Sequence, residues 1–396
     1  MESDKTVVDS DRSQKNFESF LKKKKLLYFS DAGPRLSVFA SQSVGMFRAW
    51  SEIVESDLIY RNPPGAEEYS EGRAMRQAGS LARFLLKREI RVNRLREVIP
   101  RYDIVHCRGP LATYMAIKSL SKSERKLTKI IFDCRGLISE ELGISLGKVI
   151  FQPTKMIRFL EQTKIDKYAV ENCDILLTVS EEMSRYYKRK FGRLANLVVP
   201  TIVDENSFKF SPQARDEKRN ELGIGDGRLF LYVGGVDKWQ RLDILGEFWK
   251  HHSHLNRADR LIILTRHKEL FLEELDIPDK SMADKIIFDF VTYDKVPDYM
   301  FASDFGIMFR DDSIVNRAAS PVKLSEYLAS GLPVITNCDY MVDRDSRLIY
   351  KLDDDYNFPD GLNVLDDSQR LSLSLANSHE LSGRNAVNLI KQLLIK

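Results

Sequence analysis

The sequence lacks the long apolar segment that a membrane-spanning helix requires. Such a helix needs roughly 20 consecutive apolar residues, and no run among the 396 residues approaches that length. The first residues, MESDKTVVDSDRSQKNFESF, are polar and unlike a secretory signal. The sequence therefore predicts a protein that is not inserted in a membrane and works in the cytoplasm, with at most peripheral contact at the inner face of the cell membrane.

Cysteine is scarce, and basic charge is barely in excess. The four cysteines lie far apart with no C-x-x-C pair, which argues against a zinc site or a disulfide scaffold and favours a reducing cytosol. A formal net charge of +3 is far from that of a dedicated nucleic-acid binder, so no nucleic-acid partner is expected. Two basic segments, Lys22–Lys25 and a helix predicted over 81–99, are typical either of a solvated surface or of contact with acidic lipid or an acidic acceptor.

The chain is long enough for two hydrophobic cores. Short, nearly continuous apolar runs alternate with helical patterns, which is typical of parallel strands covered on both faces. This pattern predicts an α/β fold with two Rossmann-like domains, whose strands we expect at 25–30, 103–107, 129–133, 174–180, 228–234, 260–265, 285–290, 304–309 and 333–337.

A polar segment separates the two sets of strands. Residues 198–227 contain Pro200 and Pro212 and few apolar residues, so they predict an interdomain linker. The chain ends with apolar residues at helical spacing. We expect a polar tail over 1–24, an N-terminal domain over 25–200, a C-terminal domain over 201–375 and a closing helix over 376–396.

The most informative segment is NRAASPVKLSEYLASGLPVITN, residues 316–337. Ser320 suits an N-cap, Pro321 the first helical position and Gly331 the position after the helix. Lys323 and Glu326 are three residues apart, which places both on one face. The helix follows strand 304–309, so its free N–H groups should lie at the ligand-binding edge of the sheet, where they favour an anion.

A diphosphate is the obvious anion for this helix, with Lys323 adding charge and Glu326 accepting hydrogen bonds from ribose hydroxyls. We place Glu326 on a surface-facing turn that contributes little to the fold. The alternative is a well-capped structural helix with an exposed lysine and glutamate, and the spacing alone leaves both interpretations open.

The run SPVKLSEYLASGLPVI resembles the donor-binding signature of the retaining glycosyltransferases of family four, which have the GT-B architecture with two domains facing a central cleft. In the first half, DIVHCRGPLA (103–112) and FDCRGLISEE (132–141) resemble acceptor-side loops of bacterial polysaccharide-assembling members. The resemblance implies catalytic roles for Arg135 and Glu141, and contacts with the acceptor for His106 and Arg108. It implies a donor site formed by Gly234, Gly235, Lys238, Arg241, Ser320, Pro321, Lys323 and Glu326.

The chain departs from the family pattern at three positions. Ala318 stands where many members have a sugar-binding glutamate, for which Asp311 or Asp312 is a candidate substitute. Gly235 stands where many have an arginine, and Arg135 where many have a histidine. For Arg135 we expect Glu140 or Glu141 as the anionic partner before a donor binds, since a buried arginine without one would be costly.

The resemblance implies transfer of a sugar, with retention, from a nucleoside-diphosphate sugar to a saccharide or lipid-linked acceptor, as in surface polysaccharide or glycoconjugate synthesis. No cofactor and no metal are expected, because no Asp-x-Asp pair directly follows a predicted strand. Two alternatives stay open: a sugar-nucleotide epimerase of the same architecture, and a catalytically silent protein that binds nucleotide-sugars.

Overall fold

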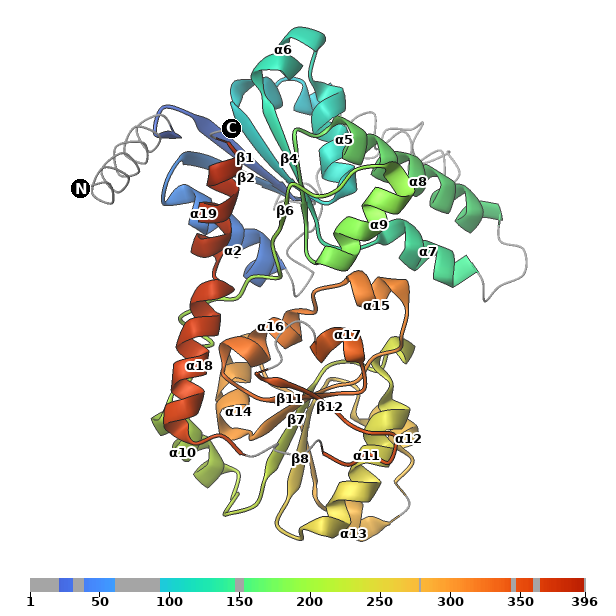
Figure 1. Ribbon diagram of the computed structural model, residues 1–396, viewed down its shortest axis with the longest axis vertical. Helices are drawn as coiled ribbons and strands as arrows, with labels where there is room; N and C mark the ends of the chain where they lie inside the picture. Colours follow the sequence, from blue (N-terminus) through green and yellow to red (C-terminus); the bar gives the residue numbers. More distant parts are fainter. Residues whose placement is uncertain are drawn as a thin grey trace, which may run out of the picture. The chain divides into compact units, whose positions relative to one another are not determined.

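The computed structural model describes residues 21–30, 39–60, 93–146, 153–277, 279–342, 347–358 and 364–394. The chain divides into two compact units (Figure 1). The first comprises the chain up to Ile202 with Ala318–Ser320 and Gly383–Lys396, and the second comprises Val203–Arg317 and Pro321–Ser382. Most of the basic helix predicted over 81–99 lies outside the described residues.

The first unit is built on a six-stranded parallel sheet with the strand order β2-β1-β3-β4-β5-β6. Its strands are β1 (Lys25–Ser30), β2 (Glu55–Tyr60), β3 (Ile104–Arg108), β4 (Lys129–Cys134), β5 (Ile175–Thr178) and β6 (Leu197–Val198). The chain reverses its direction of travel across the sheet after β2, so the order switches between β1 and β3. Such a switch point is where open α/β sheets bind ligands, at the carboxyl ends of the strands.

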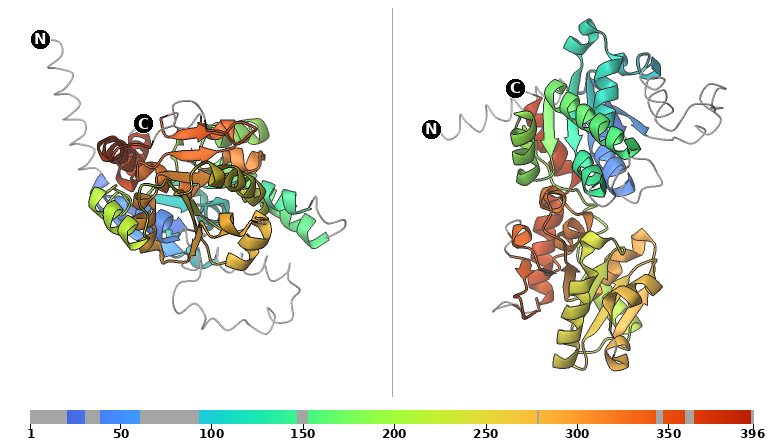
Figure 2. Two further views of the ribbon diagram at one scale, coloured as in Figure 1. Left: turned by 90° about the horizontal axis from the view of Figure 1, so that it is seen from below. Right: turned by 90° about the vertical axis from the view of Figure 1, so that its right-hand side faces the viewer.

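Helices cover both faces of this sheet. One face packs on α2 (Gly45–Ser51), which follows a π-helical turn over Phe39–Val44, and on α19 (Gly383–Leu393) near the end of the chain. The helices α5 and α8 lie on the opposite side (Figures 1 and 2). The remaining elements include a 3-10 turn over Ile99–Arg101 and the helices α5 (Pro110–Ser119), α6 (Lys122–Leu127), α7 (Ile138–Leu146), α8 (Pro153–Asn172) and α9 (Glu181–Phe191).

The second unit is a six-stranded parallel sheet with the order β12-β11-β10-β7-β8-β9. Its strands are β7 (Leu229–Val233), β8 (Arg260–Leu264), β9 (Ile286–Asp289), β10 (Phe305–Met308), β11 (Val334–Thr336) and β12 (Ile349–Lys351). Counted from β7, this is the 3-2-1-4-5-6 order of a Rossmann fold, with its switch point between β7 and β10.

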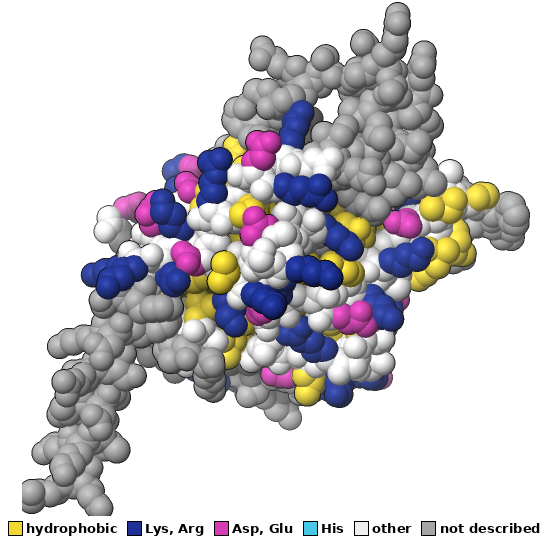
Figure 3. Space-filling model, turned by 90° about the horizontal axis from the view of Figure 1, so that it is seen from above, with side chains coloured by type: hydrophobic (Ala, Val, Ile, Leu, Met, Phe, Trp, Pro, Cys, Tyr) yellow, Lys and Arg dark blue, Asp and Glu magenta, His cyan; other side chains and the backbone are white. Residues whose placement is uncertain are grey.

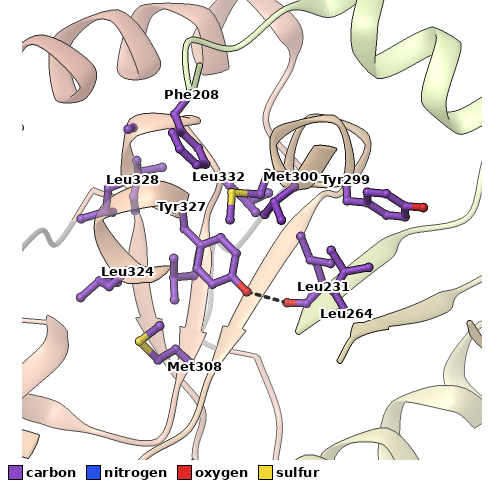
Figure 4. Packing of buried hydrophobic residues seen from close by; sticks show 14 of the residues in the cluster. Phe208, Leu231, Leu264, Tyr299, Met300, Met308, Leu324, Tyr327, Leu328 and Leu332 are labelled. Carbon is purple, nitrogen blue, oxygen red and sulfur yellow. Dashed lines mark hydrogen bonds between the residues drawn. The ribbon is translucent and has the colours of Figure 1, made fainter. Parts of the chain in front are cut away.

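The two faces of the second sheet have separate apolar cores. One core contains residues of α14 (Val296–Ala302) and α16 (Val322–Ala329), and Figure 4 shows part of it. The other contains residues of α11 (Leu242–Leu255) and α12 (Lys268–Leu275). The other helices are α10 (Pro212–Glu221), α13 (Lys280–Ala283), α15 (Ile314–Ala318), α17 (Asp339–Val342) and α18 (Asp367–Glu380), with 3-10 turns over Lys238–Gln240 and Tyr293–Lys295.

The predicted α/β class with two Rossmann-like parallel sheets is confirmed, and all nine predicted strands occur. The described residues add β2, β6 and β12, each at the edge of a sheet. Edge strands need no continuous apolar run because they have a neighbour on one side only, and β2 is accordingly half-buried at most positions.

The predicted linker contains the boundary between the two units, at Ile202 and Val203, but part of it is a helix. Residues 212–221 form α10, which Ser211 caps by accepting from the N–H of Ala214. This helix buries no residue fully, so it has no apolar signal. It is held instead by Arg215 and Arg219, which pair with the buried carboxylate of Asp304.

Candidate functional site

Two predicted donor-binding segments follow the strands on either side of the switch point of the second sheet. Strand β7 leads into Gly234 and Gly235, whereas β10 leads through α15 into α16. Because β7 and β10 are neighbours and their following segments diverge, their carboxyl ends are the expected place for a ligand.

The helix α16 is held against both of these strands. Its side chains Leu324, Tyr327 and Leu328 are buried in the core (Figure 4). The Tyr327 hydroxyl donates to the Leu231 carbonyl of β7 at 3.3 Å. On β10, a Cβ at Gly306 would lie 2.9 Å from the Tyr327 ring, so only glycine leaves room for it. The position of α16 therefore depends on this ring.

Lys323 and Glu326 form the expected pair on one face of α16. The Lys323 Nζ lies 2.6 Å from Glu326 Oε2, and the Tyr293 hydroxyl donates to Oε1 at 2.9 Å. The ammonium also lies 5.3 Å from the centre of the Tyr293 ring. Both oxygens of the carboxylate are thus engaged by neighbouring side chains.

The expectation that Glu326 lies on a surface-facing turn is wrong. Its side chain is fully buried, whereas that of Lys323 is 25% exposed. Burial raises the pKa of Glu326, although Lys323 and Tyr293 both oppose the shift. Tyr293 contacts Glu326 from a separate 3-10 turn. The spacing of residues along α16 could not reveal this contact, and so it could not reveal the burial of Glu326.

The start of α16 also differs from the prediction. Pro321 is the N-cap, and no side chain caps the helix. The Ser320 hydroxyl accepts instead from the N–H of Thr201 at 3.1 Å, and its carbonyl accepts from the Thr201 hydroxyl at 2.6 Å. Because the Ser320 hydroxyl is hydrogen-bonded to Thr201, it does not cap α16, and the first N–H groups of this helix have no side-chain cap. Gly331, with φ of 60°, follows the helix as expected.

The two glycines after β7 are not equivalent. The N–H of Gly234 donates to the Leu264 carbonyl at 3.2 Å, so it is not available to a phosphate. A Cβ at Gly234 would lie 2.8 Å from the Tyr232 hydroxyl, whereas one at Gly235 would meet nothing closer than 3.8 Å. Only Gly235 fits the expected close approach of a diphosphate.

The two cations of this loop also differ. Lys238 is exposed, and no described residue forms an ion pair with it. Arg241 pairs with Asp243 at 2.6 Å and has a left-handed backbone, with φ of 49°. Such a conformation in a residue other than glycine costs about 1–3 kcal/mol and is often found at functional sites.

Ala318, at the end of α15, is fully buried. The candidate substitutes for the missing glutamate are both engaged within their own loop. Asp311 accepts from Ser313 and Asn316, and Asp312 pairs with Arg317. A sugar hydroxyl would have to compete with these partners.

In the first unit, polar residues gather at the switch point between β1 and β3. The parallel register aligns Ser30, Arg108 and Asp133 in one row at the carboxyl edge. Tyr28 and His106 lie two residues earlier on the same face. All five side chains belong to buried residues, so this edge is a buried polar cluster.

His106 is a packed histidine within this cluster. The Trp50 indole donates to its Nδ1 at 2.9 Å, so the proton of the neutral ring is assigned to Nε2. That nitrogen lies 3.4 Å from Asp133 Oδ2. Burial lowers the pKa of His106 against the effect of Asp133.

Arg135 has a different partner from the one expected. Its Nε donates to Asp133 Oδ2 at 2.9 Å, and its Nη1 donates to the carbonyls of Val199 and Pro200. The carboxylate of Glu140 binds Lys190 and Tyr186 instead, because those side chains of α9 reach it. Glu141 is exposed on the first turn of α7, where its Oε1 would lie 3.2 Å from a Cβ at Gly136.

Comparison with known proteins finds similarity to solved structures only. No protein-family model matches the chain, and no curated protein matches it. Similar solved structures include HepE of Anabaena with UDP and glucose, which is 14% identical with a TM-score of 0.58 over 94% of this chain and 99% of that one.

Two further structures have the same breadth of similarity. Sucrose-phosphate synthase of Thermosynechococcus elongatus is 15% identical, with a TM-score of 0.60 over 94% of this chain and 99% of that one. The catalytic domain of Arabidopsis thaliana starch synthase IV, with ADP and acarbose, is 11% identical with a TM-score of 0.59 over the same shares. The fold is GT-B. At these identities the likeness establishes the architecture alone.

One hollow of this GT-B chain has none of the predicted donor residues in its lining. It measures about 190 Å³ and lies in the second unit, lined by Ile244, Asn337, Lys351, Leu352, Asp353, Asp354 and Tyr356. A nucleotide-sugar needs a site of at least about 300 Å³. This hollow is therefore too small to replace the α16 region as the candidate site.

Metal ligands are not grouped in the described part of the chain, where no three His, Cys, Asp or Glu side chains converge. Asp353 and Asp355 have the Asp-x-Asp spacing of a metal-binding pair. The Asp353 carboxylate is instead bonded within its own turn, where Oδ1 accepts from the N–H groups of Asp355 and Asn357. The other spaced pair, Asp343 and Asp345, lies outside the described residues.

Proposed function

We propose that this chain is a glycosyltransferase that moves a sugar from a nucleoside-diphosphate sugar to a hydroxyl group of a saccharide or lipid-linked acceptor, with retention at the anomeric carbon. The acceptor oxygen forms a bond to the anomeric carbon, the bond from that carbon to the diphosphate breaks, and the acceptor proton passes to the leaving diphosphate. A role in surface polysaccharide or glycoconjugate synthesis belongs to the same proposal.

The observation that carries the proposal is the Lys323–Glu326 pair on α16, a helix whose uncapped N-terminus follows β10 at the switch point. A carboxylate has about four acceptor positions, and Glu326 uses two, so ribose hydroxyls can bind it once Lys323 moves aside. The freed ammonium and the helix N-terminus then face the diphosphate. Structures similar to this chain include HepE with UDP-glucose and WaaG, a glycosyltransferase of lipopolysaccharide biosynthesis, which supports this reading.

Lys238 and Gly235 complete the proposed donor site, with Lys238 adding charge and Gly235 allowing close approach of its backbone to the phosphates. Several such contacts must act together, because each contributes about 0.3–2 kcal/mol. The proposal includes no metal and no cofactor: helix dipole and cations stabilise the leaving diphosphate.

In the first unit, the proposal assigns Arg135 and Glu141 to catalysis and His106 and Arg108 to the acceptor. The ion pair between Arg135 and Asp133 supports a positioning role for Arg135. Because burial keeps His106 neutral, it can act as a hydrogen-bonding group without adding charge.

The test measures donor binding and donor consumption by the full chain across a panel of nucleoside-diphosphate sugars, with and without acceptors. Glu326→Ala should raise the donor dissociation constant at least tenfold, about 1.4 kcal/mol. It should also destabilise the fold by about 1–3 kcal/mol, because Lys323 and Tyr293 lose their partner. Glu326→Gln, which keeps the size of the side chain, separates the two effects.

A matched control exists on α10. Lys218 and Glu221 form the same three-residue pair at 2.8 Å, but Glu221 is 66% exposed. Glu221→Ala should change neither donor affinity nor stability by more than a few tenths of a kcal/mol. Unchanged donor affinity in both Glu326 variants would remove the central assignment, and donor binding without any turnover would favour a silent binding protein.

Peripheral membrane contact stays a prediction within this proposal. In the described part of the chain, every helix is too short or too polar to traverse a bilayer. Lys24 and Lys25 of the basic run pair with Asp103 and Glu55, which leaves less free charge than the sequence suggests. Figure 3 shows Lys and Arg spread over one face with Asp and Glu among them, rather than a single basic patch.

A further inference from the structure

The polar cluster at the first switch point contains more positive than negative charge. Arg108 and Arg135 both face Asp133, and the Nε of Arg135 already binds that carboxylate. His106 adds no charge, because burial lowers its pKa. The buried edge therefore has two guanidinium groups and one carboxylate.

Arg108 is the cation among the incompletely bonded members of this cluster, which also include Tyr28, His106 Nε2 and Asp133 Oδ1. The residue is 8% exposed, and its Nη1 has no hydrogen-bond partner among the described residues. The Tyr28 hydroxyl, on the neighbouring strand, is likewise buried without a partner there. A buried guanidinium without its hydrogen bonds is costly, so a ligand that supplies acceptors would relieve a real penalty.

Two other arginines of the described residues, the buried Arg370 and the partly buried Arg193, are bound by several backbone carbonyls. Arg370 is 2% exposed and donates to the carbonyls of Met300, Phe301, Ser303 and Ser330. Arg193 donates to the carbonyls of Val170, Cys173 and Asp174. Arg108 departs from this pattern at the one place in its sheet where the topology opens a crevice.

We propose that Arg108 and Tyr28 form a subsite for an anionic group, a carboxylate or a phosphate, on the acceptor saccharide. The planar guanidinium suits two oxygens of such a group, and the Tyr28 hydroxyl supplies a further donor. The acceptor role rests on the proposed function, whereas anion binding at this edge does not. The substrate class is thereby narrowed from any saccharide to an acidic or phosphorylated one.

The test compares p-nitrophenyl β-D-glucuronide with p-nitrophenyl β-D-glucoside by calorimetric titration of the full chain. The two probes differ only at C6, which is a carboxylate in the first and a hydroxymethyl group in the second. The 6-phosphate of the glucoside is the phosphate arm. An anionic probe should bind at least tenfold more tightly than the neutral one, and Arg108→Met should abolish that preference while leaving the glucoside unaffected. The probe whose affinity exceeds that of the glucoside by the larger factor shows whether the subsite prefers a carboxylate or a phosphate.

Stability provides a second readout. Without ligand, Arg108→Met should raise the thermal midpoint by a few degrees, because it removes a buried guanidinium whose Nη1 lacks a partner and leaves Arg135 to balance Asp133. Arg193→Met is the control: it should lower the midpoint and keep the anion preference, since Arg193 donates to three backbone carbonyls away from this cluster. Equal binding of charged and neutral probes, or a preference that survives Arg108→Met, overturns the subsite.

The failure of this inference is distinguishable from that of the proposed function. Anion binding that depends on Arg108 without any donor turnover would sink the proposed transfer and keep the subsite. Donor turnover with no Arg108-dependent preference would do the reverse. If Arg108→Met instead weakened binding of UDP-glucuronate but not of UDP-glucose, the anion would belong to the donor, and the acceptor subsite would be wrong.

Discussion

The two switch points of the chain both hold buried charges, but only one cluster is closed on itself. In the second unit, the Glu326 carboxylate has a donor on each oxygen and one cation beside it. In the first, two guanidinium groups share Asp133, and donors of Arg108 and Tyr28 stay unbonded. A ligand at the second site must therefore displace an internal partner, whereas a ligand at the first adds one that is lacking.

Asp133→Asn should produce the largest effect and break the first cluster. Burial opposes ionisation of Asp133, but Arg135, His106 and Arg108 outweigh it and hold the pKa of this carboxyl well below its ordinary value. The change removes the counter-charge of one buried and one partly buried guanidinium group, so we expect a loss of about 3–5 kcal/mol in the free energy of unfolding. Urea denaturation measures it.

Asp103 provides the comparison for this loss. It pairs with Lys24 at 2.8 Å at the start of the same sheet, but both side chains are about one-third exposed. Asp103→Asn should cost less than about 1 kcal/mol. Similar losses in the two variants would contradict the picture of a buried charge cluster at the carboxyl edge.

Gly306→Ala should have an intermediate effect, in the second unit. The added methyl lies 2.9 Å from the Tyr327 ring, so the ring and α16 must shift. We expect a loss of about 1–3 kcal/mol, together with weaker donor binding because Lys323 and Glu326 move with the helix. A double variant with Tyr327→Leu, which removes the ring, should be less than additive; full additivity would mean that this contact does not position α16.

The smallest expected effect is a difference in pH dependence. Glu326 has a raised pKa, so the folded chain holds that proton more tightly: its stabilisation is full below the unfolded pKa of about 4.3 and is lost as pH rises through the folded value. Asp133 has a lowered pKa, so its stabilisation is present above about pH 4 and is lost as pH falls through the folded value.

Unfolding free energies measured from about pH 7 to pH 3 should therefore separate the two sites. Relative to Glu326→Gln, the parent should gain stability as pH falls. Relative to Asp133→Asn, it should lose stability at the acid end. Shifts of the same sign in both comparisons would show that the two clusters do not differ as described.

Apolar runs in the sequence were enough to predict the central strands of both sheets. Central strands are covered on both faces, so each leaves a continuous apolar run, and the edge strands β2, β6 and β12 do not. The helix α10 was missed for the same reason: its arginines bind Asp304, 85 to 89 residues away, and leave no apolar stripe.

The three-residue spacing of Lys323 and Glu326 fixed their pairing, because helix geometry places such residues on one face. Only the tertiary structure decided that Glu326 is buried, since Tyr293 reaches it from a different element. The parallel register likewise decided that Ser30, Arg108 and Asp133 share a row. Only the tertiary structure decided that Arg135 binds the buried Asp133 rather than a glutamate of the next helix, because Lys190 and Tyr186 of α9 bind Glu140. Spacing along one helix is a local property, whereas partners across strands depend on register and burial, which the whole fold sets.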